Sequence, residues 1–117
     1  MATEPEHLTD GEHIFHLATR SDWEQATRAG TYRTSTLGRS LDEEGFIHAS
    51  RVGQVRGVAT AFYGSVSEPL VLLEIDPARL GSEVRLEVPA GAGEAFPHIY
   101  GPIGTTAVVS VTTYSVT

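Results

Sequence analysis

The sequence contains no cysteine and no lysine, and each absence removes a class of chemistry. Without cysteine there is no disulfide, no thiolate nucleophile and no sulfur-ligated metal. Without lysine there is no Schiff-base lysine and no phosphate-loop lysine, and all eight basic residues are arginine. The missing cysteine fits a reducing compartment, so we expect a cytoplasmic protein.

Long apolar runs are also missing, so we expect no membrane span. Residues 1–12 are polar and acidic, unlike a signal peptide, and are predicted to form a flexible arm before a single domain over 13–117. A net charge of −7 with scattered arginines argues against binding long nucleic acid. A small-molecule ligand remains the expected partner, and the oligomeric state stays open.

The first half of the chain predicts two helices among short strands. Residues 14–17 form an apolar, strand-like segment, and the spacing of Ser21 and Glu24 predicts a capping box that starts a helix ending near Gly30. Residues 31–44 lack a clear period and are interpreted as a long loop, with a short strand near Tyr32 as an option.

A second strand and helix are predicted after this loop. Residues 46–49 are again short and strand-like, and Ser50 is the expected N-cap of the helix that follows. Helical spacing predicts the buried stripe of that helix. Its members are Val52, Val55, Ala59 and Phe62.

Strands dominate the second half. The run 70–75 is the most apolar and is predicted to be a central strand, while 84–88 alternates as a half-exposed strand does. Residues 96–102 form a short segment between two prolines, and 107–116 is rich in valine and threonine, as a final long strand would be. Early helices and late strands favour an α+β fold over a regular alternation.

Histidine is the residue type with the most chemical promise, and the first two histidines of interest are His16 and His48. His16 lies on a presumed buried strand, where its ring either satisfies backbone groups or binds a ligand. His48 precedes the predicted cap Ser50, and a helix start there, with Arg51 beside it, would favour an anionic group. The alternative is an ordinary cap with a solvated Arg51.

The third candidate, His98, lies in a rigid segment with Tyr100, which suits a site residue that must stay in place. The alternative is a buried strand crossing anchored by the hydroxyl of Tyr100. Glu43 and Glu44 could orient His48 or act as a base, although we favour a solvated loop tip. The three histidines are separated by 32 and 50 residues, which matches no local metal-ligand motif, so we predict no metal site.

Five motifs resemble a bacterial family known as domain of unknown function 952. They are Ile-Phe-His-Leu-Ala-Thr at 14–19, Gly-Phe-Ile-His-Ala-Ser at 45–50, Phe-Tyr at 62–63, Leu-Val-Leu-Leu-Glu-Ile-Asp at 70–76 and Phe-Pro-His-Ile-Tyr-Gly-Pro at 96–102. The resemblance covers residues 13–114 in unbroken order. The family name carries no activity.

The order of a His-and-Thr strand, a helix, a His-x-Ser strand and a second helix is also similar to the ADP-ribosyltransferase fold, above all to RNA 2′-phosphotransferases. That resemblance implies early helices packed on a mostly antiparallel, split sheet. It also implies an NAD site in which His16 and Thr19 match the first motif and His48 and Ser50 the second. Tyr32 would then stack on a base or nicotinamide. The glutamate that many toxins of this fold place on a late strand has no match here, where the late segment offers His98 and Tyr100.

Three functions follow as hypotheses. The first is a transferase that binds NAD or an ADP-ribose-like ligand, with His48, His98 and Tyr100 facing the reacting ribose and His16, Thr19, Tyr32, Ser50 and Arg51 holding the cofactor. The second is a biosynthetic cyclase, isomerase or lyase that uses histidine as acid or base. The third is a non-catalytic ligand-binding module.

Overall fold

The computed structural model describes residues 7–116, and its helices come early. The first half of the chain forms β1 (Ile14–Thr19), α1 (Arg20–Ala29), β2 (Thr31–Tyr32), β3 (Thr34–Thr36), β4 (Arg39–Ser40), α2 (Leu41–Glu44), β5 (Ile47–His48), a 3₁₀ turn (Val52–Gln54) and α3 (Val55–Tyr63). The second half forms β6 (Leu70–Ile75), a 3₁₀ turn (Pro77–Arg79), β7 (Glu83–Glu87), β8 (Phe96–Tyr100), β9 (Ile103–Gly104), a 3₁₀ turn (Thr105–Ala107) and β10 (Val108–Tyr114). The predicted α+β class is confirmed.

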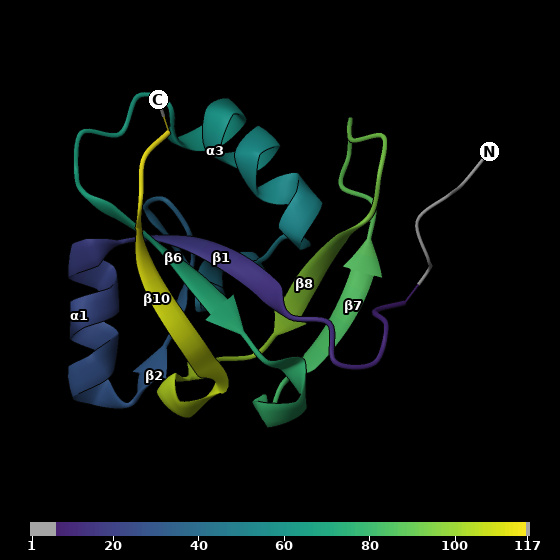
Figure 1. Cartoon of the computed structure of the whole chain (residues 1–117), viewed down its shortest axis with the longest axis horizontal. Helices are drawn as coiled ribbons and strands as arrows, with labels where there is room; N and C mark the ends of the chain where they lie inside the picture. The colour runs from purple at the N-terminus through teal and green to yellow at the C-terminus, as the bar shows by residue number, and fades with distance from the viewer. Residues whose placement is uncertain (1–6, 117) are drawn as a thin grey trace.

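Two three-stranded antiparallel sheets form the framework (Figure 1). In the first, β6 lies between β1 and β10, as its apolar sequence predicts, and Leu73 and Ile75 are fully buried. In the second, β8 lies between β5 and β7. Two short antiparallel ladders, β2–β9 and β3–β4, complete the strands.

The two large sheets meet where Phe15 of β1 faces Ser50. The backbone N–H of each residue donates to the carbonyl of the other, at 2.8 Å in both directions. One step along the chain, the N–H of Ala49 donates to the carbonyl of Pro97 at 3.0 Å, which ties the same segment to β8. This junction brings the three histidine segments into one part of the fold.

Helix α1 begins earlier than its sequence predicts. The side chain of Thr19 accepts a hydrogen bond from the Asp22 N–H and caps the helix, so the predicted capping box of Ser21 and Glu24 is wrong. The cap moves because β1 continues through Thr19 and leads directly into the helix. The predicted end is confirmed, since Gly30 adopts the left-handed conformation at φ 83° that closes many helices.

The prediction of a long loop over 31–44 is also wrong, although the optional short strand near Tyr32 is confirmed as β2. This stretch contains β2, β3, β4 and the single-turn helix α2, which Ser40 and Glu43 close with a reciprocal capping box. These strands are two or three residues long, too short to produce a visible period-two pattern. Tyr32 is 1% exposed and belongs to the core.

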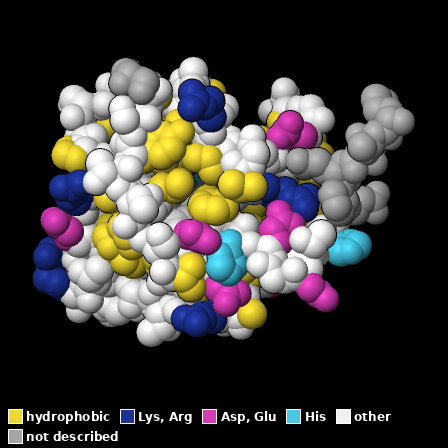
Figure 2. All heavy atoms as spheres, viewed as in Figure 1, with side chains coloured by type: hydrophobic (Ala, Val, Ile, Leu, Met, Phe, Trp, Pro, Cys, Tyr) yellow, Lys and Arg dark blue, Asp and Glu magenta, His cyan; other side chains and the backbone are white. Residues whose placement is uncertain are grey.

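The second helix starts four residues later than predicted. Ser50 is engaged in the backbone bridge to Phe15, and α3 begins at Val55 after the 3₁₀ turn, so Ser50 does not cap it. Half of the predicted stripe is correct, because Val55 and Ala59 are buried, whereas Val52 and Phe62 are 73% and 68% exposed. On the face shown in Figure 2, hydrophobic side chains gather where α3 lies in Figure 1.

The predicted N-terminal arm falls only partly within the structure, because residues 1–6 lie outside the described range. At its end, Glu12 is fixed by Arg51, whose Nε and one terminal nitrogen donate to its two carboxylate oxygens at 2.7 and 2.8 Å. These hydrogen bonds lower the pKa of Glu12 to about 2. Among residues 7–116, no helix has the length and apolar character needed to cross a membrane.

Candidate functional site

A cavity of about 470 Å³ lies beside the junction of the two sheets. β1 and β8 supply part of its wall, α3 covers it on one side, and the turn after β7 closes another. His16, His48 and His98 all line it. The other lining residues are Phe15, Leu17, Thr36, Ala49, Ser50, Val58, Phe62, Tyr63, Pro89, Ala90, Gly91, Ala92 and Phe96.

His16 has a protein partner at each ring nitrogen. Its Nδ1 lies 2.5 Å from the carbonyl oxygen of His48, and its Nε2 lies 2.8 Å from the hydroxyl of Tyr32. A carbonyl only accepts, so Nδ1 carries the proton and Nε2 accepts from the tyrosine. Burial lowers the pKa of His16 to about 4, and the ring is neutral at pH 7. His16 therefore links β1, β2 and β5 as a structural residue of the cavity wall.

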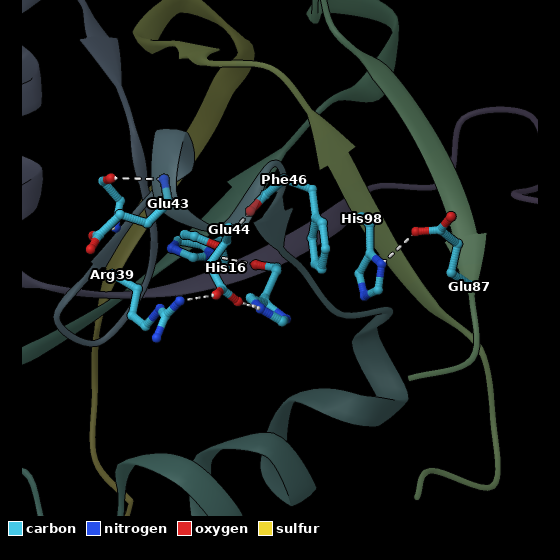
Figure 3. Close-up of polar contacts among 10 residues, drawn as sticks. His16, Arg39, Glu43, Glu44, Phe46, Glu87 and His98 are labelled. Carbon is cyan, nitrogen blue, oxygen red and sulfur yellow. Dashed lines mark hydrogen bonds and ion pairs between the residues drawn. The ribbon is translucent and has the colours of Figure 1, made fainter. Parts of the chain in front are cut away.

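His98 has a partner at only one ring nitrogen. Its Nδ1 lies 2.7 Å from Oε1 of Glu87, while its Nε2 is buried and has no hydrogen-bond partner among residues 7–116. A carboxylate accepts, so Nδ1 carries the proton and Nε2 of the neutral ring presents a bare lone pair. Figure 3 shows this nitrogen facing away from Glu87, on the side of α3. Buried polar atoms in proteins are rarely left unpaired, so the position marks a candidate reactive group.

Glu87 is held as a carboxylate by two donors. The Tyr100 hydroxyl donates to the same Oε1 at 2.5 Å, and this bond, followed by the one from His98, lowers the pKa of Glu87. The same hydrogen bond raises the pKa of Tyr100. Glu87 thereby fixes the tautomer of His98, in the way that carboxylates orient histidines at many catalytic sites.

An aromatic stack fixes the plane of the His98 ring. The ring of Phe46 lies parallel to it at 4.1 Å between centroids, with an angle of 19° between the planes, and Figure 3 shows His98 between Phe46 and Glu87. Phe46 is anchored in turn, because the buried hydroxyl of Ser35 donates to its carbonyl oxygen. A ring held by both a stack and a hydrogen bond is preorganised.

His48 lies next to His98 but is more exposed. Their ring centroids are 5.5 Å apart in an edge-to-face arrangement, and the His48 side chain is 41% exposed. Its Nε2 donates to Oε1 of Glu44 at 3.2 Å, and the other oxygen of Glu44 binds Arg39 at 2.8 Å. Glu44 therefore contacts His48, as in the less favoured hypothesis of a carboxylate that orients this ring, and not as part of a solvated loop tip. Glu43 takes part in the α2 cap.

Two of the proposed cofactor residues are engaged elsewhere. Thr19 caps α1 and does not line the cavity. Tyr32 is buried in the core against His16, and burial raises the pKa of its hydroxyl far above the ordinary value. Its ring is therefore closed to stacking on a ligand in this structure.

Arg51 and Tyr100 also lie off the cavity wall. Arg51 is 8% exposed and paired with Glu12, and no α-helix starts at Ser50 to bind an anion beside it. Tyr100 donates to Glu87 and carries the guanidinium of Arg85 over its ring at 4.4 Å. Its hydroxyl therefore contacts Glu87, the partner of His98, and does not face the cavity.

Sequence reasoning missed Glu87, although a signal for it exists. Glu87 ends the alternating segment that becomes β7, and an antiparallel hairpin with β8 pairs it with Phe96 and pairs Arg85 with His98. Residues two apart on a strand share a face, so Glu87 lies diagonally across from His98. Reading 84–88 and 96–100 as one hairpin would have found the pair.

The wall supplied by α3 and by Pro89–Ala92 was missed as well. Phe62 was predicted as part of the buried stripe of the second helix, whereas it is 68% exposed and lines the cavity. In residues 7–116, no group of three or more histidine, aspartate or glutamate side chains is arranged to hold a metal ion.

Together these features define an α+β protein with antiparallel sheets and a histidine-lined cavity. The chain belongs to the family described as "Protein of unknown function (DUF952)", whose model matches residues 17–111. The predicted family is thereby confirmed. The matched range includes His48 and His98 and begins one residue after His16.

Solved structures of protein CC0527 from Caulobacter crescentus are similar to this chain. Its crystal structure has a TM-score of 0.74 and 26% sequence identity, covering 88% of this chain and 86% of that one. Its solution NMR structure has a TM-score of 0.68 and 28% identity, covering 86% and 82%. No curated protein matches the chain.

Proposed function

We propose that the protein is an enzyme that acts on a small molecule by proton transfer, with His98 as the general base. The observation that carries this proposal is the buried, unpartnered Nε2 of a histidine whose other nitrogen donates to the Glu87 carboxylate. A general base needs an accessible lone pair, a fixed tautomer and a group that stabilises the imidazolium it becomes. Glu87 fixes the tautomer of His98 and carries the charge that stabilises the imidazolium. The lone pair on Nε2 is the group that a ligand bound in the cavity would contact.

The cavity supports a small-molecule substrate. Its volume of about 470 Å³ falls in the range of known ligand sites, and its wall is mainly apolar with a few convergent polar groups. In the proposed step, His98 Nε2 takes a proton from a C–H or O–H bond of the substrate, and the bonding electron pair stays on the substrate. Glu87 then pairs with the resulting imidazolium. Isomerisation and elimination both begin this way.

Solvent deuterium exchange tests this step without knowledge of the natural substrate. Phenylacetone and cyclohexanone are incubated with the protein in D₂O, and loss of the C–H signals beside the carbonyl is followed by NMR. We expect the wild type to exchange at least about tenfold faster than His98→Ala, a fraction of the 10²–10⁴ typical of positioned acid–base groups.

The matched control is His13→Ala. His13 also pairs through Nδ1 with a carboxylate, Glu74, at 2.6 Å, but it does not line the cavity. His13→Ala should exchange at the wild-type rate. Equal rates for wild type and His98→Ala would contradict the proposal, and ligand binding without exchange would favour a non-catalytic binding module.

A second candidate, a transferase of the ADP-ribosyltransferase type that binds NAD, is favoured by one observation. The backbone bridge between Phe15 and Ser50 sets the two histidine motifs of that resemblance side by side. Against it, Thr19, Tyr32 and Arg51 are engaged within the protein. Calorimetry with NAD and ADP-ribose tests this candidate, and saturable heat that His48→Ala abolishes would support it over proton transfer on an apolar substrate.

A further inference from the structure

The charges around the cavity restrict the ligand that it can hold. Within residues 7–116, no aspartate, glutamate or arginine is among the lining residues. Three arginines close to this site are paired with carboxylates: Arg39 binds the His48 partner Glu44, Arg51 binds Glu12, and Arg85, which faces His98 across the β7–β8 ladder, binds Glu83. A phosphate or carboxylate in this cavity would therefore meet no cationic fork of the kind that binds such groups elsewhere.

The groups behind the histidines are negative. Glu87 lies 2.7 Å from Nδ1 of His98, and Glu44 lies 3.2 Å from Nε2 of His48. The whole chain carries a net charge of −7. An anionic ligand would be repelled by these carboxylates and would also lose its hydration on entering an apolar cavity.

The orientation of His98 adds a requirement for a donor. Because Nδ1–H is committed to Glu87, the buried Nε2 accepts a hydrogen bond and donates none in the neutral ring. A ligand atom placed against it must carry a proton, or two lone pairs face each other. Phe15, Phe62 and Phe96 contribute aromatic surface to the wall of the same cavity.

We propose that the substrate class is an uncharged, largely apolar molecule, aromatic or alicyclic, that presents an N–H, O–H or acidic C–H to Nε2 of His98. This inference rests on the proposed function, because it names the substrate of the same site. Phosphorylated and carboxylated molecules are therefore not expected to be substrates of this site.

Three probes of similar shape test the inference. They are para-cresol, which is neutral with a donor, para-methylanisole, which is neutral without one, and para-toluate, which is an anion at about pH 7.5. Affinities for the whole protein are measured by NMR titration. We expect para-cresol to bind about three- to tenfold more tightly than para-methylanisole, the range of one hydrogen bond, and para-toluate to bind most weakly.

The variant His98→Phe keeps an aromatic ring but lacks the lone pair, so it should bind para-cresol and para-methylanisole equally. Tightest binding of para-toluate would overturn this inference and leave His98-dependent proton exchange standing. Equal binding of para-cresol and para-methylanisole by the wild type would overturn the donor requirement. If none of the three binds, both this inference and the proposed ligand cavity fail.

Discussion

His16 and His98 line the same cavity and are almost equally buried, at 3% and 4% exposure, yet they differ in chemistry. His16 pairs with the His48 carbonyl and the Tyr32 hydroxyl, whereas within the described part of the chain the His98 ring pairs only with Glu87. Burial alone therefore does not distinguish a functional histidine from a structural one. The hydrogen-bond partners of the two ring nitrogens do distinguish them, because a fully paired ring has no atom left for a substrate.

The largest expected effect is a difference in stability between variants of the two histidines. His16→Phe removes the ring that pairs with the Tyr32 hydroxyl and the His48 carbonyl inside the protein, which should lower the free energy of unfolding by about 2–4 kcal/mol. His98→Phe removes an unpaired nitrogen and the bond to Glu87, a carboxylate that is 37% exposed and keeps the Tyr100 donor, so it should cost less, about 1 kcal/mol. Urea denaturation near pH 7.5 measures both. Similar losses for the two variants would contradict the division of roles.

The pH dependence of stability sharpens the comparison. The pKa of His16 is about 4 in the folded protein and near 6.5 in the unfolded chain. The unfolded chain therefore takes up the proton first, so the contribution of neutral His16 is complete above pH 6.5 and is lost as the pH falls toward 4. This loss amounts to roughly 3 kcal/mol.

Denaturation curves at several pH values within this window should show a steeper decline for the wild type than for His16→Phe. Parallel declines would show that His16 does not titrate as described. Glu12, with its pKa lowered to about 2 by Arg51, acts in a lower window, because its contribution is lost as the pH falls from about 4.5 toward 2.

Glu87 is a positioning residue, and its effect should be smaller than that of the base itself. Glu87→Gln keeps a carbonyl acceptor for Nδ1–H of His98 but removes the charge that stabilises the imidazolium. The exchange rate of phenylacetone should fall about tenfold. The ¹⁵N shifts of the His98 ring report its tautomer, and the Nδ1–H form should become less dominant in the variant.

The control for this change is Glu74→Gln, which alters the matching pair with His13 outside the cavity. It should leave both the exchange rate and the His98 resonances unchanged. An equal loss of exchange in both glutamine variants would assign the effect to overall charge and not to Glu87.

The smallest effect concerns the turn that closes the cavity. The buried side chain of Gln54 donates to Glu94 at 2.7 Å and to the carbonyl of Ala95 at 2.8 Å, which ties this turn to the start of α3. Gln54→Ala should weaken para-cresol binding by a few-fold. The variant loses the two hydrogen bonds, each contributing about 1 kcal/mol, that hold this part of the cavity wall in place. NMR titration measures the change, and unaltered affinity would show that the turn is held without Gln54.

Much of the framework could be predicted from local sequence. The apolar run at 70–75 became the central strand β6, and the alternation at 84–88 became β7, because burial on one or two faces is written in the spacing of apolar residues. Residues 31–44 escaped prediction because β2 pairs with the distant β9 and because β2, β3 and β4 are all too short to show a period. Ser50 was misassigned because its bridge to Phe15 is made by backbone groups, which the residue type does not reveal.

The sequence by itself determined the α+β class, the family and the absence of cysteine and lysine chemistry. It also singled out His16, His48 and His98, which lie 32 and 50 residues apart along the chain. Only the tertiary structure decided which ring nitrogens are satisfied, because the partners of these rings come from other strands. Glu87 reaches His98 through a hairpin register and Tyr32 reaches His16 through the core. Hydrogen bonding acts over about 3 Å, a distance that sequence separation does not encode.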